Sequence, residues 1–223
     1  MTMPFYVPPE QLIKDRAEFA KKGIQRGRAI AVVEYDEGIL LIGENPSRSL
    51  HKISEIYDRV AFAGVGRFNE FETLRVAGIR YADVKGYTYA RADVTGKGLA
   101  NAYSQAVGQI FTHEVKPYEV EVLVAELGDD ENHLYHVRFD GTLRDQQGFA
   151  LLGGDEDRLL EPLAAGYRSG MSLRDAIALT TSVIRDTEDE SSPGANWEAA
   201  VLDRTRGRRK FRRLETSEIE ASG

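Results

Sequence analysis

The sequence predicts an α+β protein with a four-layer αββα architecture, in which two antiparallel sheets lie face to face and a helix pair covers each outer side. Three observations support this class. Segments with the apolar pattern of strands occur in groups, segments with helical periodicity occur in pairs between the groups, and one extra helical segment comes first. Single strands alternating with single helices would instead predict a parallel sheet wound with helices.

Residues 1–8 of the 223-residue chain form a short apolar and aromatic tail, which leads into a predicted amphipathic helix. Pro8 and Pro9 suit a first helical turn, and Gly23 is placed to end the helix. A stripe of apolar residues must be buried, either on the same domain or on a neighbouring subunit, and the sequence leaves both open. The stripe consists of Ile13, Ala17, Ala20 and Ile24, with Leu12 beside them.

Strands come next in the predicted order. Two apolar strands, 29–34 and 39–43, flank a turn, and a polar run at 44–49 leads to Lys52. One strand is expected within 53–64. Two helices follow, the first capped by Asn69 and ending near residue 82, the second starting near Thr95.

The second half repeats this alternation. A loop at 112–117 precedes strands at 119–126, 133–140 and 149–152. One helix follows Asp155, and another opens at Ser172 with a capping box. After a polar loop at 186–196, a hairpin of 197–203 and 209–214 closes the fold. We therefore expect a tail (1–8), one domain (9–214) and a flexible C-terminal tail (215–223).

Composition excludes several function classes. The formal net charge of −7 gives no global support for nucleic-acid binding, and the absence of cysteine removes disulfides and thiolate chemistry. No signal peptide and no apolar run of about 18 residues is present, so we expect a cytoplasmic protein without a membrane partner. A local basic segment fits a charged edge strand or subunit contact better than a nucleic-acid patch. It contains Arg204, Arg206, Arg208, Arg209, Lys210, Arg212 and Arg213.

Motifs for catalysis or cofactor binding are absent. His133 and His136 would point to opposite faces of a strand, so we expect no metal site. Gly64-Val65-Gly66 lacks the context of a dinucleotide fingerprint and is interpreted as a strand-to-helix turn. Neither a nucleophile elbow nor a phosphate-binding loop occurs, and no cofactor is expected.

Several segments, in order, resemble proteasome α-type subunits, above all those of the actinobacterial 20S core. The similarity spans nearly the whole chain. It is carried by Pro9-Glu10-Gln11, Arg26-Gly27-Arg28, Glu44-Asn45-Pro46-Ser47-Arg48, Lys52-Ile53-Ser54-Glu55-Ile56-Tyr57-Asp58, Phe68-Asn69-Glu70-Phe71-Glu72, Asp93-Val94-Thr95-Gly96, Val201-Leu202-Asp203 and Arg208-Arg209-Lys210-Phe211-Arg212-Arg213.

The resemblance implies an N-terminal-nucleophile hydrolase fold and a homoheptameric α ring stacked on rings of β subunits. In such particles the α rings admit unfolded protein substrates and bind a hexameric regulatory ATPase. The catalytic β subunits use an N-terminal threonine whose own amine is the base. Here that strand begins near Ala29, within the chain, so no catalytic residue is expected. The alternative is an active threonine peptidase subunit.

The resemblance also assigns site residues. Lys52 matches the lysine that pairs with the C-terminal carboxylate of the ATPase, and Arg26 and Arg28 are expected beside it. An internal ion pair of Lys52 with Glu44 or Glu55 is the alternative. The gate over the pore corresponds to Met3, Pro4, Phe5, Tyr6, Val7 and Pro8, and the constriction below it to Thr112, His113, Glu114, Val115 and Lys116.

Overall fold

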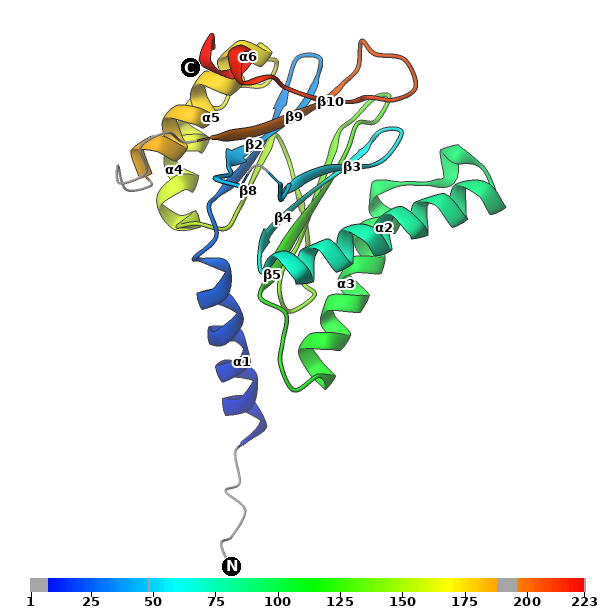
Figure 1. The fold of residues 1–223 in the computed structure, drawn as a ribbon, viewed down its shortest axis with the longest axis vertical. Coiled ribbons are helices and arrows are strands. Elements are labelled where there is room, and N and C mark those ends of the chain that lie inside the picture. The colour runs from blue at the N-terminus through cyan, green and yellow to red at the C-terminus, as the bar shows by residue number, and fades with distance from the viewer. Residues whose placement is uncertain (1–7, 48, 188–195, 223) are drawn as a thin grey trace, which may run out of the picture.

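The protein folds as two stacked antiparallel sheets between helices, as the sequence predicts (Figure 1). The computed structural model describes residues 8–47, 49–187 and 196–222. One sheet has the strand order β10-β9-β2-β1-β8 and the other β3-β4-β5-β6-β7.

The first sheet is built around β1 and β2, which pair antiparallel from Ile30 opposite Gly43 to Tyr35 opposite Gly38. Both strands are almost wholly buried, which explains their continuously apolar sequence. The strands of this sheet are β1 (Ile30–Tyr35), β2 (Gly38–Glu44), β8 (Phe149–Leu152), β9 (Trp197–Asp203) and β10 (Phe211–Arg213).

The second sheet has β5 at its centre, paired with β4 and β6. Its strands are β3 (Ile53–Tyr57), β4 (Val60–Gly66), β5 (Val120–Glu126), β6 (His133–Val137) and β7 (Leu143–Gln146). Gly66 ends β4 at a φ of +111°, and a Cβ there would lie 1.9 Å from the oxygen of Glu119. Gly66 therefore serves a tight backbone turn, whereas Gly64 lies within β4 opposite Val122, where a Cβ would come 3.0 Å from the side chain of Phe71.

Two pairs of helices cover the outer faces. Helices α4 (Glu156–Gly166) and α5 (Leu173–Thr187) pack on the first sheet, and α2 (Phe68–Thr88) and α3 (Gly96–His113) on the second. A short 3₁₀ turn, η1 (Arg91–Asp93), joins the latter pair. The core between the sheets contains inward residues of both, such as Val32 and Leu123.

Helix α1 (Pro9–Ile24) extends from one end of the sandwich (Figure 1). Its apolar stripe is divided. Ala20 and Ile24 join the core between the sheets, whereas Leu12 and Ile13 are 45% and 55% exposed. The C-terminal half of the helix thus packs on its own domain, and the N-terminal half leaves apolar surface in solvent.

Two strands are missing from the predicted order. Where one strand was expected within 53–64, residues 53–66 form a hairpin of β3 and β4, because residues 58 and 59 make a turn between them. The edge strand β7 was not predicted, since its side chains are mostly exposed and carry no apolar signal.

Two predicted ends also differ. Helix α2 begins at Phe68 after Arg67, so Asn69 is not its N-cap, and it continues to Thr88. The tail 215–223 was expected to fray, but Thr216–Glu220 form α6. Its Ile219 is 1% exposed and belongs to the apolar cluster on the outer face of the first sheet, and this anchor and the capped first turn hold the short helix.

Candidate functional site

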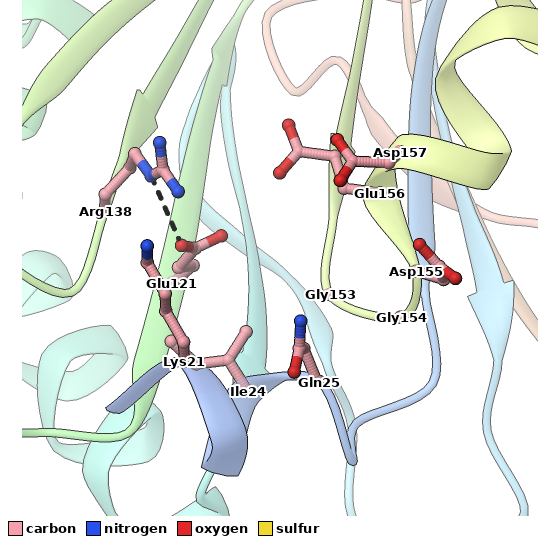
Figure 2. A pocket seen from close by; sticks show the side chains of 10 residues that line it. All are labelled: Lys21, Ile24, Gln25, Glu121, Arg138, Gly153, Gly154, Asp155, Glu156 and Asp157. Atoms are coloured by element: carbon pink, nitrogen blue, oxygen red, sulfur yellow. Dashed lines mark ion pairs between the residues drawn. The ribbon is translucent and has the colours of Figure 1, made fainter. Parts of the chain in front are cut away.

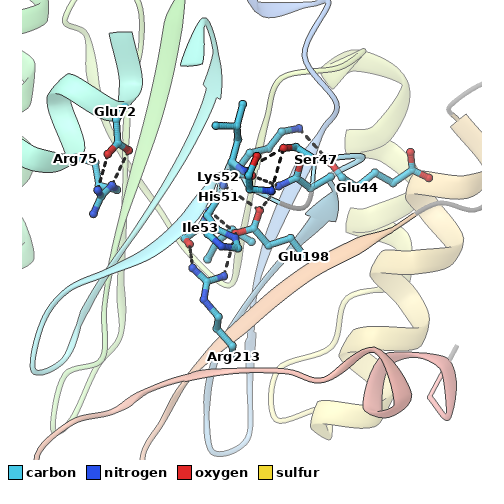
Figure 3. A network of polar contacts seen from close by, with 12 residues as sticks. Glu44, Ser47, His51, Lys52, Ile53, Glu72, Arg75, Glu198 and Arg213 are labelled. Carbon is cyan, nitrogen blue, oxygen red and sulfur yellow. Dashed lines mark hydrogen bonds and ion pairs between the residues drawn. The ribbon is translucent and has the colours of Figure 1, made fainter. Parts of the chain in front are cut away.

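A cluster of charged residues lies where β1 begins, at the rim of the first sheet (Figure 3). The ammonium nitrogen Nζ of Lys52 donates to the main-chain oxygen of Arg28 at 3.3 Å and to that of Glu44 at 3.1 Å. The Nη1 atom of Arg28 lies 3.3 Å from Oε2 of Glu44. The structure thus brings together Arg28 and Lys52, two of the predicted site residues.

Strand pairing explains this juxtaposition. Ile30 lies opposite Gly43, so the residues just before β1 and at the end of β2 are neighbours. Glu44 is 7% exposed, and a carboxylate so far from water requires a charged or hydrogen-bonding partner. Arg28 supplies one.

The polar run before Lys52 forms the expected loop and is stabilised by its own side chains. Oδ1 of Asn45 accepts a hydrogen bond from the backbone N–H of Ser47 at 3.1 Å, and Oγ of Ser47 accepts one from Leu50 at 3.0 Å. Such side-chain turns explain why Asn and Ser occur here.

Glu198 on β9 holds the other end of this loop. Its carboxylate accepts hydrogen bonds from the backbone N–H groups of Lys52 and Ile53 and from the side chain of Asn45. Sequence reasoning missed this residue. The available signal was a charged residue at a strand position whose alternate neighbours, Ala200 and Leu202, face the core between the sheets.

The cluster brings two cations together at a position that has no nucleophile. Ala29 is fully buried and has only a methyl group, and α1 precedes it in the chain, so neither a hydroxyl nor a free amine is available at the start of β1. Arg28 and Lys52 provide positive charge and N–H donors, which suit a carboxylate.

Arg26, the third residue predicted here, lies in the exposed turn after α1. The gate residues Met3, Pro4, Phe5, Tyr6 and Val7 are outside the described part of the chain. Pro8 is exposed, and its oxygen accepts the first hydrogen bond of α1, from Leu12 at 3.1 Å.

The predicted constriction loop begins later than expected. Thr112 and His113 belong to the last turn of α3, where the hydroxyl of Thr112 donates to the oxygen of Gly108 at 2.8 Å. Glu114 caps this helix through its backbone, and Val115 is 95% exposed.

This segment is tied to its surroundings on both sides. Lys116 pairs with Glu70 at 2.6 Å and with Glu119 at 2.9 Å. Burial lowers the pKa of Lys116, but hydrogen bonds to these two carboxylates outweigh that effect and raise it. Arg16 of α1 donates to the main-chain oxygens of Phe111 and Thr112, so α1 and the end of α3 are linked.

A second polar cavity, of about 190 Å³, opens between the end of α1 and the loop before α4 (Figure 2). Lys21 and Arg138 line one wall beside Glu121. Nε2 of His136 lies 3.1 Å from Oε2 of Glu121, and both side chains are almost fully buried. The opposite wall is acidic and is formed by Asp155, Glu156 and Asp157. Sequence reasoning considered His136 only as a metal ligand and missed this pair.

The basic segment near the C-terminus is largely used within the chain. Arg204 donates to the main-chain oxygens of Gly128 and Asp129, Arg209 binds Glu55, and Arg212 binds Glu218. Strand β10 is the edge strand of its sheet and carries Arg212 and Arg213, so the edge-strand interpretation applies to these two, whereas the other five basic residues lie between β9 and β10.

The described residues offer neither a metal site nor a membrane span. They contain no group of three His, Asp or Glu side chains placed to hold a metal ion. None of the helices within those same ranges is both long enough and apolar enough to cross a membrane.

Comparison with known proteins shows the family. The family model described as proteasome subunit matches residues 24–202. The chain is 55% identical over 226 residues to the proteasome subunit alpha of Nocardioides sp., covering 99% of this chain and 89% of that protein. It is 53% identical over 223 residues to the proteasome subunit alpha of Thermomonospora curvata, covering 99% and 97%. The corresponding protein of Streptosporangium roseum is 52% identical over 223 residues, with 99% and 86% covered.

These matches agree with the observed sandwich and with a β1 that lacks a nucleophile. The chain therefore belongs to the proteasome subunit family, as a noncatalytic outer-ring α subunit of the 20S core that assembles with other proteasome subunits.

Proposed function

We propose that this chain forms a homoheptameric ring on proteasome β-subunit rings in the cytoplasm, and that Lys52 docks the C-terminal carboxylate of a hexameric regulatory ATPase. The ATPase would deliver unfolded protein substrates through the α ring. The tail at residues 3–8 would gate that entry, and the segment 112–116 would form the constriction below it.

The observation that carries the docking role is the fixed position of the Lys52 ammonium group. This group lies at the rim of the first sheet and donates hydrogen bonds to the main-chain oxygens of Arg28 and Glu44. The guanidinium group of Arg28 lies beside the carboxylate of Glu44. An ammonium group at a fixed position beside a guanidinium group suits an incoming carboxylate. Arg26, exposed two residues before Arg28, adds positive charge on the approach.

The alternative role for Lys52 was an internal ion pair with Glu44 or Glu55. Lys52 contacts Glu44 through the main-chain oxygen, while the Glu44 carboxylate lies next to Arg28. The carboxylate of Glu55 binds Nε of Arg209 at 2.8 Å. The replacement of Lys52 described below decides between the two roles.

The divided stripe of α1 supports the ring. Leu12, Ile13 and Phe19 are between 45% and 55% exposed, although a single chain gains nothing from leaving such residues in water. A neighbouring copy in the ring would cover them. Arg16 ties α1 to the end of α3, where the proposed constriction segment begins.

Replacing Lys52 tests the docking role. The Lys52→Ala variant is co-expressed with a β subunit, and degradation of an unfolded protein is measured with and without the ATPase. We expect intact particles that hydrolyse small peptides normally but lose ATPase-dependent degradation. Lys97→Ala, which removes an exposed lysine of α3, is the control and should behave as wild type. Unchanged ATPase-dependent degradation by Lys52→Ala would exclude the proposed role.

A further inference from the structure

We propose that Glu198 is a positioning residue, which fixes the segment Lys52-Ile53 so that the Lys52 ammonium group stands ready for a carboxylate. This inference rests on the docking role proposed above. Glu198 comes from a distant part of the chain and would not contact the docked carboxylate itself.

The Glu198 carboxylate is almost completely used by hydrogen bonds to this segment (Figure 3). Its Oε2 atom accepts from Nδ2 of Asn45 at 2.7 Å and from the backbone N–H of Lys52 at 2.9 Å. Its Oε1 atom accepts from the backbone N–H of Ile53 at 3.1 Å and from Nη1 of Arg213 at 3.0 Å. Charge-assisted bonds of this kind are roughly twice as strong as those between neutral groups.

Burial makes these bonds rigid. Glu198 is only 9% exposed, and it belongs to β9 of the first sheet, whereas Ile53 begins β3 of the second. The carboxylate therefore joins the two sheets at the point where the loop enters β3. A buried carboxylate cannot exchange these donors for water, so the loop is held in one arrangement.

Arg213 completes the arrangement around Ile53. Its Nη2 atom donates to the oxygen of Ile53 at 2.7 Å, while Glu198 accepts from the N–H of the same residue. Both main-chain polar groups of Ile53 are thus bound by one ion pair. His51, on the other side of Lys52, has Nδ1 3.4 Å from Oε1 of Glu198.

Lys52 is consequently held at both ends. Its backbone N–H is fixed by Glu198, and its ammonium group by the oxygens of Arg28 and Glu44. A lysine side chain has many rotamers, and ordering it before binding lowers the entropic cost of docking. Loss of the backbone anchor would leave the ammonium group mobile relative to the incoming carboxylate.

The test uses assembled particles and the C-terminal peptide of the regulatory ATPase, with its α-carboxylate free or amidated. In Glu198→Gln one acceptor oxygen becomes an NH₂ group that faces N–H donors, so one of the two backbone anchors is lost and the negative charge is removed, while side-chain size is kept. We expect the free-carboxylate peptide to bind roughly tenfold more weakly or worse, as for loss of a charged hydrogen bond. Binding of the amidated peptide should not change.

A double variant separates positioning from general structural damage. If Glu198 acts through Lys52, then Glu198→Gln adds nothing once Lys52→Ala is present. An equal further loss in the double variant would overturn the proposal. Glu121→Gln is the control, since it removes an equally buried carboxylate that pairs with His136 elsewhere in the sandwich. It should leave peptide affinity at the wild-type value.

Hydrogen exchange tests the positioning independently of docking. The amides of Lys52 and Ile53 should exchange faster in Glu198→Gln, and unchanged protection would overturn the inference. If Lys52→Ala leaves peptide affinity unchanged, the docking role itself fails, whatever the exchange shows. If Glu198→Gln particles do not assemble, Glu198→Asp is used instead, because it keeps the carboxylate charge on a side chain that is shorter by one methylene group. This variant should bind the peptide less tightly, and wild-type affinity would again overturn the proposal.

Discussion

The Nζ atom of Lys52 lies 3.3 Å from the main-chain oxygen of Arg28, two residues before the first residue of β1. In a catalytic N-terminal-nucleophile subunit, a lysine in this place supports a terminal threonine. Here α1 and Arg28 precede this position in the chain, and the residue at the position itself is Ala29. The chain therefore has a lysine beside the start of β1 but no nucleophile there.

Restoring a hydroxyl at this position should not restore catalysis. In Ala29→Thr the threonine would still lack a free amine, since α1 precedes it. Ala29 is fully buried, and a Cβ built on Gly154 would lie 3.0 Å from its methyl group, so the larger side chain should destabilise the fold by about 1–3 kcal/mol. Denaturant unfolding and hydrolysis of a fluorogenic peptide measure the two effects.

The matched control is Ala29→Ser, which adds the hydroxyl with less volume. It should be as inactive as the threonine variant and closer to wild type in stability. Peptide hydrolysis by either variant, in the absence of β subunits, would contradict the account of why this subunit is noncatalytic.

The layers of the fold were predictable because their signals are local. Continuous apolar runs such as Ile39-Leu40-Leu41-Ile42 identify strands buried on both faces, and the Ser172 cap, whose Oγ accepts from the N–H of Asp175, identifies the start of α5. Edge strand β7 was missed because its exposed residues have no such pattern. Helix α6 was missed because its stability comes from one distant contact, that of Ile219 with the core under α5.

The candidate site was predictable only in part for the same reason. Lys52 and Arg28 were singled out by resemblance, and strand pairing does place them together. Glu198 is separated from Lys52 by 146 positions, so only the folded chain shows that its carboxylate holds the loop. Buried ionic contacts between distant segments leave no periodic pattern in a sequence.

Removing the tail should open the particle. Deleting residues 2–7 leaves Pro8, whose oxygen accepts the first hydrogen bond of α1, so the helix should remain intact. We expect particles with this deletion to hydrolyse small peptides faster than wild type without any ATPase. Deleting residues 2–8 should have the same effect on the rate, with additional fraying of α1. A rate equal to that of wild type for both deletions would argue against a gate in this tail.

The exposed half of α1 should be needed for ring formation and not for folding. Ile13 is 55% exposed in the single chain. The Ile13→Asp substitution should therefore change the free energy of unfolding of the isolated subunit by less than about 0.5 kcal/mol. In a ring contact the same charge would be buried, and assembly should fail. Native mass spectrometry of the co-expressed particle measures this.

Lys14→Asp is the control for Ile13→Asp, because Lys14 is exposed on the same turn and pairs only loosely with Glu18, at 3.9 Å. We expect its particles to assemble. Normal assembly of Ile13→Asp would show that the contact between copies lies elsewhere on the subunit.

Acid should weaken the fold partly through Asp58, in the turn between β3 and β4. Hydrogen bonds from Arg91, at 2.6 and 2.8 Å, hold the pKa of its carboxyl below the ordinary value of 3.8. A carboxyl whose pKa is lower in the folded state contributes stability that is fully present above its unfolded pKa. That contribution is lost as the pH falls through the folded value.

The variant Asp58→Asn should therefore be less stable than wild type at neutral pH, by about 1 kcal/mol or less for such a solvent-exposed pair, and the difference should shrink as the pH falls below 3.8. The backbone hydrogen bond from Lys210 to the oxygen of residue 58 is unaffected by this change. Asp129→Asn is the control, because that carboxylate is 96% exposed and lies 3.7 Å from Arg59. Urea unfolding of the isolated subunit across this pH range measures both variants. If the Asp58→Asn difference were equally large in acid, the contact with Arg91 would act through packing and not through charge.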